Sequence, residues 1–257
     1  MFIRTEPETY NKPFKRKKKM TPILEKARLL RYIPGLKPLL LPIYTWYANK
    51  RRNYLYRKNG LKVLYEFDKI MNDNNIHYAV FAGTLLGAIR EKGFLRHDMD
   101  IDTVMFYRNY SPIIQNLLEA NGFKLLHTFL IDDGRTGRED TFIKNGVTVD
   151  IYYIYSDDKC STYQCDFHGA NGAPDNEQSM KIYGYTAVRR IEFPVSEKVR
   201  RVQFENIEVN VPANAEEWLS LRYGSDYMTP NPNFKDKGDN PHIIEWSGKK
   251  AIMLMYQ

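Results

Sequence analysis

The stretch GTLLGAIREKGFLRHDMDID, residues 83–102, brings a glycine turn, a row of cations and a row of aspartates into one short segment. The run before it, IHYAVFAG, predicts a buried strand that stops at Gly83. Thr84 can cap a helix through TLLGAIREK. MDIDTVMF, 99–106, predicts a second strand. The segment therefore predicts a strand, a helix and a strand, with charged residues at the second junction.

The aspartates alternate along the predicted strand. If 98–102 is extended, Asp98, Asp100 and Asp102 share one face. Same-face residues are roughly 6.5–7 Å apart, so two carboxylates can converge on a divalent cation, whereas without one they raise each other's pKa. Three aspartates on an edge strand could equally be a solvated face. The apolar residues Ile101 and Val104 favour a core strand.

A further aspartate, Asp150, lies inside the apolar run VTVDIYYIY. A buried carboxylate without a partner is costly, so we expect Asp150 to join Asp100 and Asp102 from a neighbouring strand. Oxygen ligands are what Mg²⁺ or Mn²⁺ prefers, and Mg²⁺ commonly binds substrate phosphates. We expect these three aspartates to hold the metal, with Asp98 one step outside on the substrate side.

The glycine turn and the cations predict the phosphate half of the same site. A strand that enters a helix through Gly83 and Thr84 aims backbone N–H groups at an anion. Arg90, Lys92 and Arg96 can neutralise phosphate oxygens. Each cation could instead lie in water at a helix end. The combination of turn, D-x-D strand and a third strand aspartate is more specific than any one of its parts.

The remaining elements follow from local signals. Leu61 begins a helical pattern that ends in NDNN, 72–75, whereas residues 21–58 look helical but interrupted by prolines. Ser111-Pro112 predicts a capped helix, and Asn145-Gly146 predicts a tight hairpin. The other expected elements are a strand at 123–130, a hairpin at 203–212, a helix from Asn214 to Gly224, and irregular segments at 156–186 and 228–242. This alternation is typical of an α/β or α+β chain.

Charge divides the chain into two parts. Its net charge is +7, but residues 1–60 carry +13 and residues 61–257 carry −6. We therefore expect a basic, helical and amphipathic arm, 1–60, and a catalytic domain, 61–257. An acidic body argues against nucleic-acid binding. Apolar and aromatic residues at 39–48 between basic clusters predict an anionic membrane surface as a partner, although this segment could simply pack on the body.

Location is predicted from absences. The N-terminus shows no signal-peptide pattern and no run reaches the length of a membrane-spanning helix, so we expect a cytoplasmic protein, peripheral at the inner face of the membrane. Cys160, Cys165 and His168 lack a fourth zinc ligand nearby, which favours free thiols in a reducing compartment.

These motifs together resemble those of a known protein family. The order of strand, G-[ST] turn, helix, D-x-D strand and later aspartate strand resembles the polymerase-β-like nucleotidyltransferase fold. AGTLLGAIREKGFLRHDMDID resembles the LicD family, and VDIYYIYSDD and VQFENIEVNVPANAEEWLSLRYGSDYMTPNP are similar to later segments of it. The resemblance covers roughly residues 61 to 232. The family includes bacterial phosphocholine transferases and the animal fukutin and fukutin-related proteins, which transfer ribitol phosphate.

This resemblance implies an α+β fold with a mixed sheet flanked by helices, and a metal-dependent transferase. It would move a phospho-alcohol, phosphocholine or ribitol phosphate, from a CDP-activated donor to a sugar hydroxyl of a cell-surface glycan and release CMP. The glycan could be lipid-linked, as in the synthesis of cell-envelope polysaccharides such as lipopolysaccharide or teichoic acid. Asp100 and Asp102 would be metal ligands, and Asp150 a third ligand or the general base.

Three residues depart from the family pattern: His97 stands where tryptophan is common, Met99 where aspartate is common, and Glu91 where histidine is often seen. These departures bear on which donor is used rather than on catalysis, because the D-x-D pair and Asp150 are all present. Two alternatives use the same residues differently. A nucleotidyltransferase would move the nucleotide itself and release pyrophosphate from an NTP, and a glycan-binding scaffold would not need its aspartates.

Overall fold

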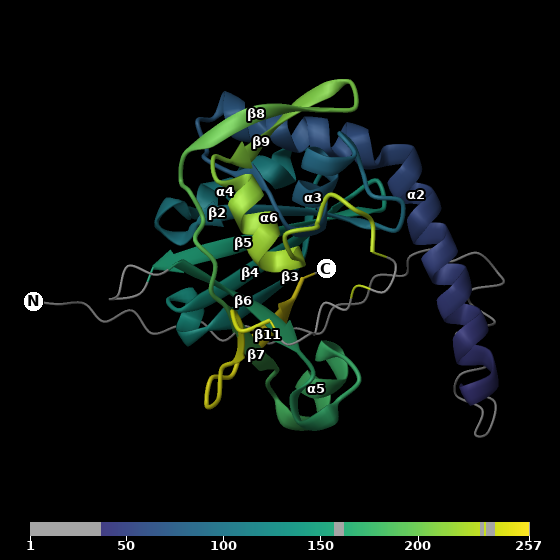
Figure 1. Ribbon diagram of the computed structural model, residues 1–257. Helices are drawn as coiled ribbons and strands as arrows, with labels where there is room; N and C mark the ends of the chain where they lie inside the picture. The colour runs from purple at the N-terminus through teal and green to yellow at the C-terminus, as the bar shows by residue number, and fades with distance from the viewer. Residues whose placement is uncertain (1–36, 157–161, 232–233, 235–239, 257) are drawn as a thin grey trace, which may run out of the picture. The chain divides into compact units, whose positions relative to one another are not determined.

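The computed structural model describes residues 37–156, 162–231, 234 and 240–256. The chain divides into two compact units, residues 1–50 with Gln257, and residues 51–256. Of the first unit the structure describes the beginning of helix α2 (Lys37–Asp73). The second unit holds the sheet and the helices that cover it (Figure 1). No helix in the described part of the chain is long and apolar enough to cross a membrane.

Among the described residues, nine strands form one mixed sheet. Its order is β10 (Ile243–Glu245), β7 (Ala187–Ile191), β6 (Thr162–His168), β5 (Val147–Ser156), β4 (Gly137–Lys144), β3 (Lys124–Ile131) and β11 (Ile252–Met255). All neighbours in this order are antiparallel. The strand β2 (Asp100–Phe106) instead runs parallel to β5, and the short β1 (Ala79–Val80) pairs with β2. The parallel pair is the part of the sheet that positions the aspartates.

Helices and a hairpin cover the sheet near this parallel pair. They are α3 (Ala82–Arg90), α4 (Pro112–Ala120), α6 (Ala215–Tyr223) and the separate two-stranded hairpin of β8 (Val199–Phe204) and β9 (Ile207–Pro212), and α5 (Asn176–Tyr183) lies near β11 (Figure 1). Short 3₁₀ turns lie at Tyr107–Asn109, Asp132–Gly134 and Ala170–Gly172. Phe67, Phe81 and Trp218 are among the largest fully buried side chains between these layers. The structure confirms a mixed fold of helices and sheet.

Two turn predictions are confirmed. The Ser111 hydroxyl accepts a hydrogen bond from the Ile113 N–H, with proline at the first position of α4. Asn145 and Gly146 have φ of 52° and 82°, as a two-residue hairpin turn between β4 and β5 requires. The Gly146 turn also packs against Leu55, and the Asn59 amide donates to the Asn145 carbonyl at 2.8 Å.

The N-terminal helix differs from the prediction. A single helix, α2, runs through Pro38 and Pro42 and on past Leu61, where the sequence predicted interruptions and a separate helix. Pro38 lies in the first turn, where a backbone N–H has no helical partner, and Pro42 removes only one hydrogen bond. Pro34 lies outside the described residues. Tyr56, in the predicted arm, is fully buried in the core.

The segment 156–186 is not irregular as predicted, because it contains β6 and α5. The apolar residues Tyr163, Cys165 and Phe167 recur at every second position of β6 and are buried, and the polar Gln164 between them is buried as well. Asp175 caps α5 by accepting from the Gln178 N–H at 2.7 Å. Residues 157–161 of this segment lie outside the described residues.

Candidate active site

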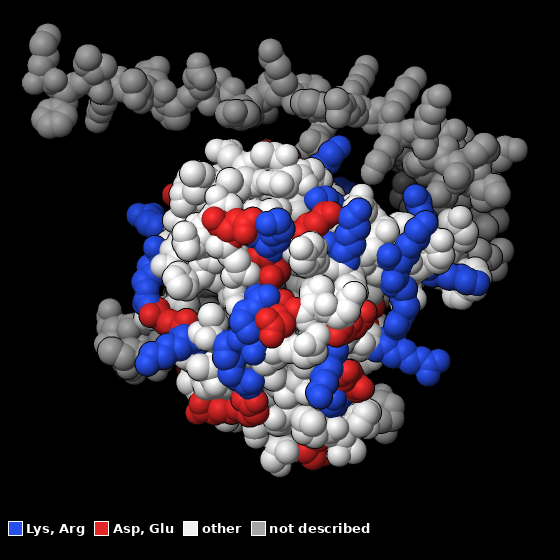
Figure 2. All heavy atoms as spheres, turned by 90° about the horizontal axis from the view of Figure 1, so that it is seen from above, with Lys and Arg blue, Asp and Glu red and all other residues white. Residues whose placement is uncertain are grey.

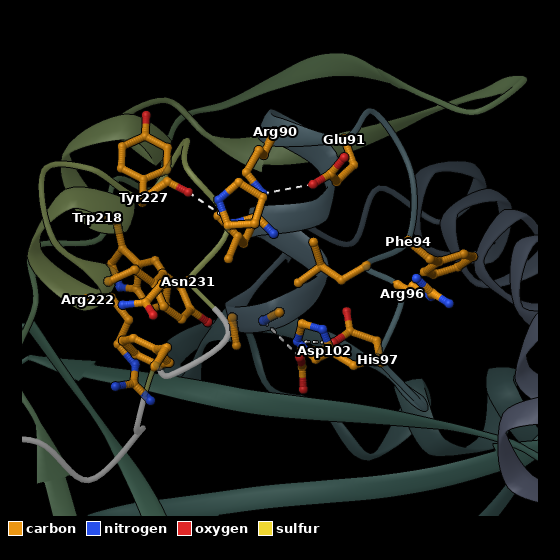
Figure 3. Close-up of a pocket in the computed structure, with 18 of the residues that line it drawn as sticks. Arg90, Glu91, Phe94, Arg96, His97, Asp102, Trp218, Arg222, Tyr227 and Asn231 are labelled. Atoms are coloured by element: carbon orange, nitrogen blue, oxygen red, sulfur yellow. Dashed lines mark hydrogen bonds and ion pairs between the residues drawn. The ribbon is translucent and has the colours of Figure 1, made fainter. Parts of the chain in front are cut away.

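A cleft of about 1160 Å³ lies above the parallel pair of strands. Its walls come from α3 and the following loop, from the sheet, and from α6 with the segment after it. In Figure 3, Asp102 and His97 lie on the side of the sheet, Arg90 lies near Tyr227 and Glu91, and Arg222 and Trp218 lie on the side of α6. Of the sequence-predicted residues, Gly83, Arg90, Arg96, Asp98 and Asp102 line the cleft.

The glycine turn locks the helix to the aspartate strand. The N-cap of helix α3 is Phe81, three residues before the predicted cap, so Thr84 is not the cap but lies in the first turn. The Gly83 N–H donates to Asp102 Oδ2 at 3.1 Å, and the Asp102 N–H donates to Thr84 Oγ1 at 2.9 Å. Gly83 and Thr84 therefore position Asp102, and the Gly83 N–H is already occupied within the protein.

Asp102 and Asp150 are register partners in the parallel pairing of β2 and β5. The Thr141 hydroxyl donates to Asp150 Oδ1 at 2.6 Å. Burial raises the pKa of Asp102 well above its usual range, and the charges of Asp100, Asp150 and Asp98 add to the effect. Burial also raises the pKa of Asp150 to about 7, with Thr141 opposing. The prediction that these two strands are neighbours is confirmed.

Asp100 has a cationic partner from α2. The Arg52 guanidinium donates to Asp100 Oδ2 at 2.7 Å, and also reaches the Met99 carbonyl and Thr148 Oγ1, each at 3.3 Å. Asp100 and Asp150 do not belong to the lining of the cleft. The aspartates predicted as one row are therefore held in different environments, with Asp102 facing the cleft and Asp100 tied to Arg52.

Asp98 is closer to the centre of the site than the sequence suggested. Both of its carboxylate oxygens and Asp102 Oδ2 lie within 3.2–3.4 Å of the position that a Cβ atom on Gly83 would occupy. Its side chain is 12% exposed, and its Oδ2 is buried with no hydrogen-bond partner in the described part of the chain. Burial raises the pKa of Asp98 to about 7, and the charge of Asp100 adds to this while Arg57 and Arg90 oppose it.

The acidic residues fit a divalent cation in chemistry. Their donors are all carboxylate oxygens, they raise one another's pKa, and Asp98 presents an unpaired oxygen over Gly83. As arranged, no group of three or more His, Cys, Asp or Glu side chains in the described part of the chain is placed to hold a metal ion. The metal ligands Asp100, Asp102 and Asp150 stay a prediction.

The predicted cations separate into two groups. Arg90 is largely buried, donating from Nε to Glu91 at 2.9 Å and from a terminal nitrogen to the Tyr227 carbonyl at 3.1 Å. Arg96 lines the cleft. Lys92 does not, because it lies in a turn with φ of 52°, where its carbonyl accepts from the Glu205 N–H. Arg90 and Arg96 therefore line the same cleft as Asp98 and Asp102, whereas Lys92 does not.

Comparison with known proteins identifies the fold family. Residues 75–214 match the family model described as LicD/FKTN/FKRP, nucleotidyltransferase domain. The chain belongs to this family. The matched region contains the glycine turn, the D-x-D strand and Asp150, so the resemblance predicted from those motifs is confirmed.

Individual relatives in the family are distant. The chain is 25% identical over 191 residues to the ribitol-5-phosphate transferase FKTN of Mus musculus and 22% identical over 190 residues to that of Homo sapiens. These alignments cover 74% and 73% of the chain but 37% of each relative. An uncharacterised protein of Caenorhabditis elegans is 29% identical over 111 residues, which is 42% of the chain and 29% of that protein.

Two residues near the candidate site, Glu139 and Tyr152, were not singled out from the sequence. Glu139 on β4 is a register partner of Tyr152, and burial, together with the charges of Asp150 and Asp166, raises its pKa well above the usual range. Tyr152 lines the cleft. Glu139 and Thr141 are two residues apart and share one face of β4, which the sequence could have indicated. Which face of the strand meets the cleft, however, depends on the order of strands in the sheet.

The wall opposite the aspartates comes from residues that follow the matched region 75–214. Trp218, Arg222, Tyr223, Tyr227 and Phe234 line it. The Trp218 indole is 1% exposed, and among the residues that the structure describes its N–H has no hydrogen-bond partner. The similarity of NAEEWLSLRYG to the family marked this stretch, but neither spacing nor composition assigned its side chains to the cleft.

Of the three residues weighed as zinc ligands, the structure describes Cys165 and His168. Burial raises the pKa of the Cys165 thiol to about 12, so this thiol keeps its proton. His168 Nε2 lies 2.9 Å from Glu245 Oε2. Cys160 lies outside the described residues.

Proposed function

We propose that the protein transfers a phospho-alcohol from a CDP-activated donor to a hydroxyl of a glycan and releases CMP. Ribitol phosphate and phosphocholine are the candidate groups, and the family relationship to ribitol-5-phosphate transferases supports the first of them. The observation that carries the proposal is the convergence of Asp98 and Asp102 over Gly83 at the base of a cleft that also contains Arg90 and Arg96.

In the reaction, the acceptor oxygen forms a bond to the phosphorus of the phospho-alcohol, and the bond from that phosphorus to the CMP oxygen breaks. Arg90 and Arg96 would bind the phosphate oxygens and offset their charge. The proton of the acceptor hydroxyl goes to a carboxylate at the base of the cleft. Asp98 lines the cleft and Asp150 lies one strand away, and burial places the pKa of each at about 7, close to what a general base needs at neutral pH.

A bound Mg²⁺ or Mn²⁺ would polarise the phosphoryl group and stabilise the negative charge of the departing CMP. Asp98, Asp100, Asp102 and Asp150 would hold it. Arg52 fixes the orientation of Asp100, and Gly83 and Thr84 fix that of Asp102. We also propose that the parallel pair β2–β5 with α3 is a polymerase-β-like core, since the order of turn, helix and aspartate strands agrees with that fold.

The test is the identity of the released product. The full chain is incubated with Mn²⁺, a sugar acceptor panel and, in separate reactions, CDP-ribitol, CDP-choline and CDP-glycerol. Release of CMP that requires an acceptor and is lost in Asp102→Asn supports the proposal. Release of pyrophosphate from CTP with a phospho-alcohol, and no CMP from any CDP-alcohol, would establish the nucleotidyltransferase instead. Asp133→Asn, at a carboxylate whose side chain is 87% exposed, is the matched control.

A further inference from the structure

One face of α2 carries exposed cationic and aromatic side chains. We call this face the α2 stripe, and it consists of Arg51, Tyr54, Lys58, Lys62, Tyr65 and Lys69, all of them exposed. They recur at intervals of three or four residues, so they lie on one side of the helix. Tyr56, Leu64 and Phe67 on the opposite side are buried in the core. The stripe is therefore the side of α2 that faces away from the sheet.

The two tyrosines of the stripe, Tyr54 and Tyr65, expose their rings to solvent rather than packing them in the core. Tyr54 is 61% exposed and Tyr65 is 49% exposed, and the Lys58 ammonium lies 6.0 Å from the Tyr54 ring centre. An aromatic ring with a polar tip is suited to the boundary between water and lipid headgroups. In the other unit, Trp46 and Tyr47 are 61% and 44% exposed, so the same composition extends towards the N-terminus of the helix.

The cations of the stripe are only partly neutralised. Lys62 pairs with Glu66 at 3.9 Å and Lys69 with Asp73 at 2.7 Å, both of them exposed pairs that contribute little. In the region that the structure describes, Arg51 and Lys58 form no ion pair with a carboxylate. Figure 2 shows lysine and arginine side chains spread over the face seen there, with acidic side chains between them. The stripe itself carries four cations and no carboxylate.

We propose that the α2 stripe binds the surface of a bilayer that contains anionic phospholipids. Its cations meet the lipid phosphates, and Tyr54 and Tyr65 lie among the headgroups. A single-stranded nucleic acid would need a basic groove with stacking platforms, whereas the stripe lies on the convex surface of one helix. The complementary charge and the interleaved aromatic rings both favour a lipid surface.

The same helix forms part of the active site from its other side. Arg57 lines the cleft and Arg52 donates to Asp100. Binding of the stripe to a bilayer would hold the cleft beside the lipid surface, where a lipid-linked acceptor is presented. This last consequence rests on the proposed function, whereas the binding surface itself does not.

The experiment is sedimentation of the full chain with vesicles. One set is phosphatidylcholine alone, and the other contains about a third phosphatidylserine. The test variant combines Arg51→Gln, Lys58→Gln and Lys62→Gln, and its control combines Lys124→Gln, Arg135→Gln and Lys181→Gln, three cations exposed elsewhere. Each cation near such a surface contributes roughly fivefold in affinity, so we expect the test variant to bind the anionic vesicles about a hundredfold more weakly. The control should bind like the wild type.

A second variant, Tyr54→Ser with Tyr65→Ser, separates lipid from other polyanions. It should bind the vesicles several-fold more weakly while binding of a single-stranded oligonucleotide, used as competitor, does not change. Wild-type binding to neither vesicle set would overturn the proposal, as would equal losses in the test and control variants. Displacement from the vesicles by the oligonucleotide at equal phosphate concentration would identify the stripe as a nucleic-acid surface instead. Since CMP release is not measured, these results are independent of the proposed reaction.

Discussion

The backbone N–H of Gly83 donates a hydrogen bond to Asp102 Oδ2 at 3.1 Å, which joins the first turn of α3 to the aspartate strand. The side of Gly83 that lacks a side chain faces the carboxylates of both Asp98 and Asp102. The glycine therefore does two things at once. It orients one carboxylate, and it leaves room for a second to approach the first.

Gly83→Ala is expected to weaken Mn²⁺ binding roughly tenfold with little change in stability. Its methyl group would lie 3.2–3.4 Å from the Asp98 and Asp102 oxygens, which are the ends of side chains that can move apart. Gly87→Ala is the contrasting change, because its Cβ would lie 2.4 Å from the Gly93 carbonyl oxygen. We expect Gly87→Ala to lower the free energy of unfolding by about 1–3 kcal/mol. Calorimetry with Mn²⁺ and urea unfolding measure both effects, and equal behaviour of the two variants would contradict this assignment.

The aspartates are expected to act together in metal binding. Asp100→Asn, Asp102→Asn and Asp150→Asn should each weaken Mn²⁺ affinity at least about tenfold, because each removes a charged oxygen donor from one cluster. Titration calorimetry on each variant measures this, with Asp133→Asn as the control. If all three variants bound Mn²⁺ as the wild type does, the metal site would have to lie elsewhere.

Asp98 is expected to make stability depend on pH in the absence of metal. Its carboxyl keeps its proton up to a pH of about 7 in the folded state, against an ordinary pKa of 3.8, because burial and the charge of Asp100 oppose ionisation. The folded state thus binds more protons between these values, and the free energy of unfolding falls as pH rises through this window. Asp98→Asn cannot ionise and lacks this loss.

Urea unfolding in the presence of EDTA from pH 4 to 8 tests this expectation. The difference in unfolding free energy between Asp98→Asn and the wild type should move in favour of the variant by up to about 4 kcal/mol across the range, because each unit of pKa shift corresponds to about 1.36 kcal/mol. A difference that stays constant with pH would show that the Asp98 carboxyl titrates normally in the folded protein.

Adjacent arginines on β8 give a matched pair for stability. Arg201 and the Tyr78 hydroxyl both donate to Asp68, whose side chain is only 8% exposed. Arg201→Ala should therefore cost about 2 kcal/mol, less than a fully buried pair because Arg201 itself is 37% exposed. Arg200→Ala removes only the exposed pair with Glu216 and should cost under about 1 kcal/mol. Comparable costs in thermal unfolding would contradict a special role for the buried network.

Local chemistry made several elements predictable from the sequence. Ser111-Pro112 and Asn145-Gly146 specify their own backbone conformations, and the apolar run around Asp150 identified a buried strand. The strands β10 and β11 were missed because each is short and depends on pairing with a distant strand, β7 or β3. The continuous helix α2 was missed because local proline rules count against it, whereas its buried face, with Tyr56 and Phe67, stabilises it through the core.

The sequence predicted which site residues share a strand, but not the contacts between residues of different elements. Alternation placed Asp98, Asp100 and Asp102 on one face, and Asp150 was expected beside them. The sequence could not show that the Arg52 guanidinium donates a hydrogen bond to Asp100, because the two residues lie on different elements. Nor could it show that Lys92 turns away, since a φ of 52° in that turn depends on how the loop meets Glu205.

The Asn145-Gly146 turn is closed against α2 by Leu55 and Asn59, and it fixes how β4 pairs with β5. Side chains on a strand alternate between faces, so a single inserted residue in this turn would put the apolar Val149 in the place of Asp150 at the site. An insertion of two would keep the faces but move Thr141 away from Asp150. The length of this turn thus sets which residues of β5 reach the site. We expect the chain to tolerate substitutions in the turn far better than insertions or deletions.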